Sequence, residues 1–135
     1  MSAALTQAID FHQRASRFSR QAKLDAAVAL GEWGVFSAAQ ISEMLDIPKW
    51  ERKAIAPHIR KTDRTGGRLR PEALEPLLRV AQLRANGEID VFAVKAAIDA
   101  GASMRMASRL TGVPETSLKR YYAKADQLTR GGTFA

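Results

Sequence analysis

The chain contains no cysteine, and aromatic residues make up only 7% of its 135 residues. Without cysteine it can form neither a disulfide framework nor a thiolate metal site, which fits a reducing cytoplasm. It also lacks a continuous apolar stretch long enough to be a signal peptide or a membrane span. We therefore expect a soluble cytoplasmic protein that has no membrane partner.

Groups suited to catalysis are equally scarce. The two histidines, His12 and His58, are isolated in the sequence and cannot supply a metal cluster, and no carboxylate pair stands out. Gly66 and Gly67 lack the Lys-Ser/Thr sequel of a phosphate-binding loop, and we expect them to form an ordinary loop rather than a wing against DNA. The sequence predicts a protein that is not an enzyme and that holds no cofactor or metal.

Sustained alternation of apolar and polar residues is missing as well. Apolar residues instead recur at spacings of three and four, which predicts helices and argues against long strands. A hydrophobic content of 46% is enough for one packed domain of ordinary size or for two very small ones. The sequence therefore predicts an all-α protein.

Positive charge is abundant and unevenly distributed. A net charge of +7 and an isoelectric point near 10.2 favour an anionic partner. Residues 49–70 carry eight basic residues against two acidic ones, a net charge of +6, and residues 103–135 carry six against two, a net charge of +4. Residues 24–48 carry four acidic residues and no basic one. The basic charge thus gathers in two separate segments, although a charge run is also typical of a solvated surface.

The second basic segment, Ser103 to Tyr122, has the pattern of two helices joined by a tight turn. Ala107, Leu110 and Leu118 are spaced to face one another, and Gly112 stands where a short turn demands a positive φ. This arrangement predicts a helix-turn-helix that binds duplex DNA. The residues left on the outer face of its second helix, where such a helix meets base edges and phosphates, are Glu115, Thr116, Ser117, Lys119 and Arg120.

These outer residues have different expected roles. Thr116 and Ser117 can contact a phosphate, because the dipole and the free N–H groups of the helix N-terminus already favour an anion there. Arg120 could pair bidentately with guanine, which contributes about 1–3 kcal/mol of discrimination between bases. Lys119 and Arg120 could equally both contact the DNA backbone, giving affinity without sequence information.

Residues 36–55 align without gaps with the segment that begins at residue 102, which predicts a second helix-turn-helix. Ser37 and Gln40 have the spacing of a capping box at the start of its first helix. Asp46 replaces the turn glycine, and Arg52 falls where Leu118 would be buried, so we expect a longer or reoriented turn. The residues predicted to pack inside are Trp50, Ala54 and Ile55, with Trp50 assigned to the core rather than to stacking on bases. The predicted DNA contacts are Lys49, Glu51, Arg52 and Lys53, with Arg60, Lys61 and Arg64 as phosphate contacts.

Further helices are predicted around these two units. Pro71 is well placed as a first helical residue, and Asp90 is placed to begin the supporting helix of the second unit. The predicted organisation is an N-terminal helix-turn-helix domain (1–66), a linking helix (67–89), a C-terminal helix-turn-helix domain (90–125) and a flexible tail (126–135). The stripe of Arg14, Arg17 and Arg20 could lie along phosphates or reach a minor groove, or it could be a plain solvated face.

Two resemblances add to this interpretation. Ala97 to Tyr122 resembles the DNA-binding region of the Hin-like resolvases and invertases, without their catalytic domain. The two-unit architecture, with the segments FSAAQISEMLDIP and ASRLTGVPETSLKRYY, resembles the immunity repressors of temperate actinobacteriophages. That resemblance implies transcriptional repression and lysogeny in a bacterial host cell, with a monomer on an asymmetric operator and a dimer not excluded. The alternatives are a recombination or excision accessory factor, a small phage packaging subunit, and an adaptor that binds protein rather than DNA.

Overall fold

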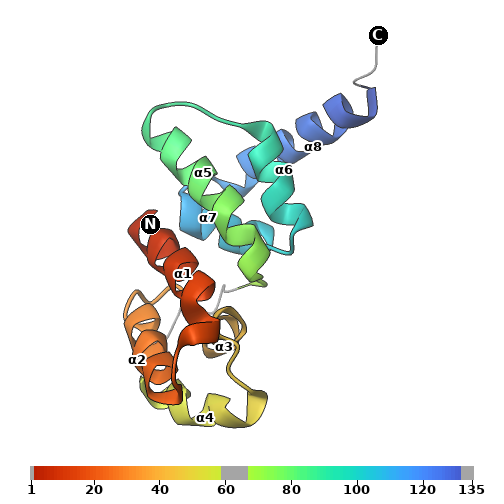
Figure 1. The fold of residues 1–135 in the computed structure, drawn as a ribbon. Coiled ribbons are helices and arrows are strands. Elements are labelled where there is room, and N and C mark those ends of the chain that lie inside the picture. The colour runs from red at the N-terminus through yellow and green to blue at the C-terminus, as the bar shows by residue number, and fades with distance from the viewer. Residues whose placement is uncertain (1, 59–66, 132–135) are drawn as a thin grey trace.

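Every regular element in the described part of the chain is a helix, as the sequence predicted. The computed structural model describes residues 2–58 and 67–131 (Figure 1). The N-terminal half contains α1 (Ser2–Arg14), the short 3-10 helix η1 (Ala15–Arg17), α2 (Arg20–Gly31), α3 (Ala38–Leu45), η2 (Lys49–Glu51), α4 (Arg52–Ile55) and η3 (Ala56–His58). The C-terminal half contains η4 (Pro71–Ala73), α5 (Leu74–Ala85), α6 (Val91–Asp99), α7 (Met104–Thr111) and α8 (Glu115–Gly131).

Short polar side chains fix the start of several helices. The predicted capping box is present at α3: Ser37 Oγ accepts a hydrogen bond from the Gln40 N–H at 3.2 Å, and Gln40 Oε1 accepts one from the Ser37 N–H at 2.8 Å. Asp90 caps α6 by accepting hydrogen bonds from two backbone N–H groups, and Ser103 caps α7. Each cap satisfies backbone donors that have no partner inside the helix, and this is why the boundaries fall at these residues.

One continuous hydrophobic core runs through both halves of the molecule. Helix α5 packs against α6 and α7 in its own half and also against α1 of the other half. It contributes the buried side chains Leu74 and Leu77, while Phe36 and Leu30 are buried in the N-terminal half. The segment that the sequence analysis treats as a linking helix is therefore part of the core that joins the halves.

Polar contacts also connect the two halves. Arg109 Nη2 on α7 donates a hydrogen bond to the carbonyl oxygen of Gly34 at 2.9 Å, across 75 positions of sequence. Gln40 Nε2 on α3 donates to the carbonyl oxygen of Gly67. The Ser103 N–H, at the start of α7, donates to the carbonyl oxygen of Arg68 at 2.9 Å. The helices of the two halves are thus tied together at their edges as well as through the core.

Helix α8 extends to Gly131, so residues 126–131, which the sequence analysis assigned to a flexible tail, are helical. Side chains on α6 hold this helix: Lys95 Nζ lies 2.7 Å from Asp99 Oδ2 and 3.7 Å from Asp126 Oδ1, and the Tyr122 hydroxyl donates to Asp99 Oδ1 at 2.7 Å. The hydrogen bond from Lys95, and then that from Tyr122, holds the pKa of Asp99 below its usual range. Across residues 2–58 and 67–131, no helix has the length and apolar character needed to cross a membrane.

Candidate nucleic-acid interface

Helices α7 and α8 meet at a tight turn whose inner residues are those that the sequence predicted. Ala107, Leu110 and Leu118 are buried, and Val113 in the turn is buried between them. Gly112 ends α7 in the left-handed conformation, with φ 81° and ψ 0°. Because side chains other than hydrogen crowd the backbone at such a φ, glycine is the residue that adopts it at the least cost.

The outer side of this turn and of α8 is polar and open to solvent. Thr116, Lys119 and Arg120 are exposed, while Glu115 and Ser117 are partly buried. Three of the five side chains predicted to face DNA from α8 therefore lie fully on its outer side. The Arg120 guanidinium is 5.3 Å from the centre of the Tyr121 ring, a cation–π contact that steadies it on the surface.

Helix α3 and the elements after it repeat the local construction of α7 and α8. Both α3 and α7 are eight residues long, and each begins at a capping serine and ends at a left-handed residue. At the end of α3 that residue is Asp46, with φ 54° and ψ 50°, and the Lys23 ammonium donates to its carbonyl oxygen at 3.1 Å. A buried aliphatic residue and a proline follow in each copy, Ile47 and Pro48 in the first. The gapless alignment thus holds through the turn, without the longer or reoriented turn that the sequence suggested.

The two copies differ after the proline. Where α8 continues as one long helix, the first copy has the 3-10 turn η2, the four-residue helix α4 and the 3-10 turn η3. Ile55 is the residue that enters the core here, and Ala54 is exposed. Arg52, which takes the position of Leu118, is partly buried, and its Nε atom is buried without a hydrogen-bond partner among the described residues. Arg52 therefore does not enter the core as Leu118 does in the second copy.

The structure contradicts the prediction made for Trp50. It was predicted to pack in the core with Ile55, but 75% of its surface is exposed. The physical reason lies in the next residue: Glu51 is only 13% exposed and its carboxylate lies 3.1 Å from the Arg20 guanidinium, so the 3-10 turn places Glu51 against α2 and Trp50 outside. Glu51, predicted to contact DNA, is thus already paired within the protein.

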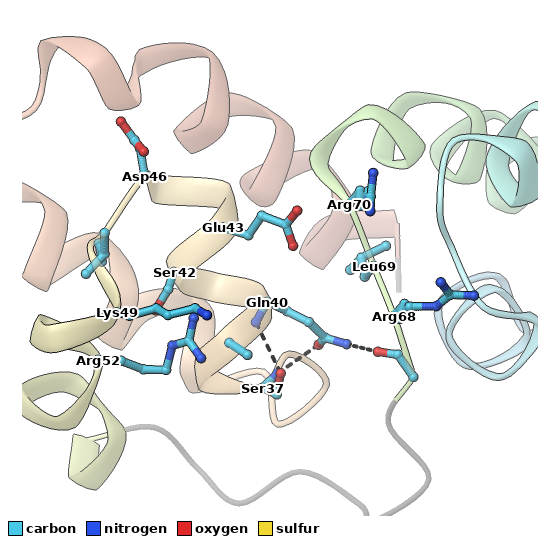
Figure 2. Close-up of a pocket in the computed structure, with 13 residues that line it drawn as sticks. Ser37, Gln40, Ser42, Glu43, Asp46, Lys49, Arg52, Arg68, Leu69 and Arg70 are labelled. Carbon is cyan, nitrogen blue, oxygen red and sulfur yellow. Dashed lines mark hydrogen bonds between the residues drawn. The ribbon is translucent and has the colours of Figure 1, made fainter.

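A cleft of about 560 Å³ lies between α3, the start of η2 and α4, and residues 67–70 (Figure 2). Lys49 and Arg52 line it on the α4 side, and Arg68 and Arg70 stand on the segment that runs past the other side of α3. Glu43 also lines the cleft, so its charge is mixed. Arg68 and Arg70 belong to the basic run of residues 49–70, but no pattern in the sequence places them near α3.

The remaining predicted contacts divide into two groups. Lys49 and Lys53 are exposed beside Trp50. Arg60, Lys61 and Arg64 lie outside the described residues.

Partners within the protein hold much of the predicted arginine stripe on α1 and α2. Arg14 pairs with Asp10 at 2.6 Å and lies over the rings of Phe11 and Phe18, and Arg20 pairs with Glu51. Two of its three side chains therefore have internal partners.

The described residues bring together no group of three His, Asp or Glu side chains that could hold a metal ion. His12 is used structurally, because its Nδ1 atom lies 2.9 Å from the carbonyl oxygen of Met44 near the end of α3. His58 is exposed at the end of η3. The site presents exposed lysines and arginines, one exposed indole, and the hydroxyls of Thr116 and Ser117 near the start of α8.

Comparison of the chain with protein-family models, with curated proteins and with solved structures gave no match.

Proposed function

We propose that the protein is a sequence-specific double-stranded DNA-binding transcriptional repressor that uses two helix-turn-helix units on one asymmetric operator. The observation that carries the proposal is the repeated construction of α3 and α7: serine cap, eight-residue helix, left-handed turn residue, buried aliphatic residue and proline. In a helix-turn-helix, the residues that follow such a turn enter the major groove and contact base edges with their first side chains.

Exposure and charge on the elements after the turns support this proposal. Lys49 and Lys53 are exposed in the first unit, and Lys119 and Arg120 in the second. Basic side chains at these positions can neutralise phosphates, which supplies most of the affinity of a protein for DNA. Helices α4 and α8 belong to different halves of the molecule (Figure 1), which supports contact with two separate groove segments rather than one.

Two unlike units in one chain favour an asymmetric site. The first presents lysines and an indole from short helical turns, whereas the second presents Thr116, Lys119 and Arg120 from a long helix. Because these side chains differ, the two groove segments that they contact would differ in sequence, and one chain would suffice without a symmetric dimer. The resemblance to the immunity repressors of actinobacteriophages extends the proposal to the silencing of lytic genes.

Selection from a random duplex library, followed by footprinting of the selected site, tests the proposal directly. We expect a non-palindromic site with two protected segments of unlike sequence. Affinity for that site should exceed affinity for random duplex by at least about a thousandfold at physiological salt, the lower end of the usual specificity range. Recovery of no shared sequence, with only weak binding that salt abolishes equally on all duplexes, would refute it.

The position of the selected site separates a repressor from a recombination accessory factor. A reporter gene placed behind the site should lose expression when the protein is present. Strong bending of the site, seen as a position-dependent gel mobility, together with unchanged reporter expression would favour the accessory factor instead.

A further inference from the structure

Trp50 is the most exposed of the large hydrophobic side chains in the described part of the chain, at 75%. The backbone around it is nevertheless anchored. Ile47 before it and Ile55 after it are 7% and 1% exposed, and Glu51 beside it pairs with Arg20. Since a 3-10 helix has three residues per turn, neighbouring side chains point about 120° apart, and a Glu51 held against α2 leaves Trp50 directed away from the protein.

The other tryptophan shows what a partly exposed indole looks like when the protein itself uses it. Trp33 is 40% exposed, and its Nε1 donates a hydrogen bond to Gln7 Oε1 at 2.8 Å. Trp50 makes no hydrogen bond and no ring contact with any residue that the structure describes. It also occupies the position that Thr116 has in the second copy, one residue inside the helical element that follows the turn.

The surroundings of Trp50 identify the chemistry of its partner. Lys49 directly before it and Lys53 three residues after it are exposed, and the neighbouring carboxylate of Glu51 pairs with Arg20. An exposed indole close in sequence to two exposed lysines fits a polyanion that also presents an apolar group. Duplex DNA has such a group in the major groove, the 5-methyl of thymine, and only A·T pairs carry it.

We infer that the indole of Trp50 packs against a thymine methyl in the major groove and so determines part of the sequence specificity of the first unit. This inference rests on the proposed function. Lys49 and Lys53 supply contacts to the flanking phosphates, which position the indole but carry no sequence information. Large aromatic side chains that lose their exposure on binding are among the residues that carry most of the energy of an interface.

Two measurements on the selected duplex test this inference. The first uses the Trp33→Phe variant, in which Trp50 is the only tryptophan, and follows quenching of its fluorescence by acrylamide. We expect quenching to fall when the duplex is added. The second replaces each thymine of the site in turn by deoxyuridine, which removes the methyl and nothing else. One replacement should lower wild-type affinity about fourfold, the value of one buried methyl-sized group.

The Trp50→Ala variant connects the two measurements. It should fold normally, because the side chain is exposed, and it should bind the thymine and deoxyuridine forms of the contacted position equally. Its affinity for the selected site should fall about tenfold or more. The matched control is Lys53→Ala, which should weaken binding to selected and random duplexes alike and keep the response to deoxyuridine.

The outcomes distinguish this inference from the proposed function. Absence of specific duplex binding by the wild-type protein refutes the proposed function itself. If the operator is bound while Trp50 stays fully open to acrylamide, the proposed function stands and the inference is wrong. Shielding of Trp50 without any effect of deoxyuridine also overturns the inference, because the indole then contacts sugar or unstacked bases.

Discussion

Replacing Gly112 by alanine should destabilise the protein by about 1–2 kcal/mol, and by more than the same change at Gly87. The two glycines have nearly the same positive φ, 81° and 76°. Alanine therefore incurs a similar left-handed cost of roughly 1–2 kcal/mol at both positions. The reduced entropy of the unfolded chain offsets about 0.4–1 kcal/mol of this cost. At Gly87 little else is added, because a new Cβ atom would meet nothing within 4 Å.

Gly112 differs because the Arg84 side chain lies against it. A Cβ atom there would lie 2.6 Å from Arg84 Nη1, so the guanidinium has to move. Displacing a flexible side chain from its preferred rotamer costs about 0.5–1.5 kcal/mol. We therefore expect Gly112→Ala to be the more destabilising change by about that amount, and the difference to vanish when Arg84 is also replaced by alanine.

Urea unfolding followed by the helical circular dichroism signal measures these free energies for each variant. The denaturation midpoint should fall while the slope stays unchanged, since the surface exposed on unfolding is the same. Equal midpoints for Gly112→Ala and Gly87→Ala would refute the argument from close approach. A stability of Gly112→Ala above that of the wild type would refute the argument from the left-handed turn.

Three further predictions concern other parts of the molecule. Leu118→Ala should lower the free energy of unfolding by about 2–5 kcal/mol, because the side chain is 1% exposed, and an unchanged urea midpoint would contradict its core role. Lys119→Ala should change stability by less than about 0.5 kcal/mol and lower the salt slope of DNA binding by about one, whereas an unchanged slope would remove it from the interface. Lys95 and Tyr122 lower the pKa of Asp99, so its stabilising contribution is present above the ordinary pKa of aspartate and is lost as pH falls through the lowered value. Lowering the pH should consequently reduce the free energy of unfolding of the wild type more than that of Asp99→Asn. Equal reductions in the two proteins would show that the interaction has no net effect on stability.

The features that the sequence predicts well are those set by a few neighbouring residues. The capping box of Ser37 and Gln40, the cap at Asp90 and the positive φ of Gly112 each depend on hydrogen bonds or steric limits within one turn of helix. The inner face of α7 follows from spacing alone, because a helix that buries Ala107 also buries the residue three positions later. Local rules therefore suffice for the helices and for the turn between α7 and α8.

The errors arise where distant residues decide the outcome. Trp50 has the composition of a core residue, but its exposure follows from the pairing of Glu51 with Arg20 on α2, which no local pattern indicates. Residues 126–131 continue α8, and Asp126 at the start of this stretch lies 3.7 Å from Lys95 of α6, a contact between distant residues. In one place an apolar residue suggests the core and in the other a polar segment suggests a tail, and in both the structure has an ion pair with another helix that no local pattern indicates.

The junction between the halves bears on how two units would act together under the proposed function. A flexible linker lets two binding units adapt to many spacings, and the second unit then acts at an effective concentration that the linker sets. Here α5 packs on α1, and Arg109 of α7 donates to the carbonyl oxygen of Gly34, so the units are held in one arrangement before any DNA is bound. Because the second unit is already oriented, its binding would cost little further conformational entropy. The same rigidity would restrict binding to one spacing of the two DNA segments. Selectivity would then come from the rigid junction as well as from base contacts, because a site with the right bases at the wrong spacing engages only one unit.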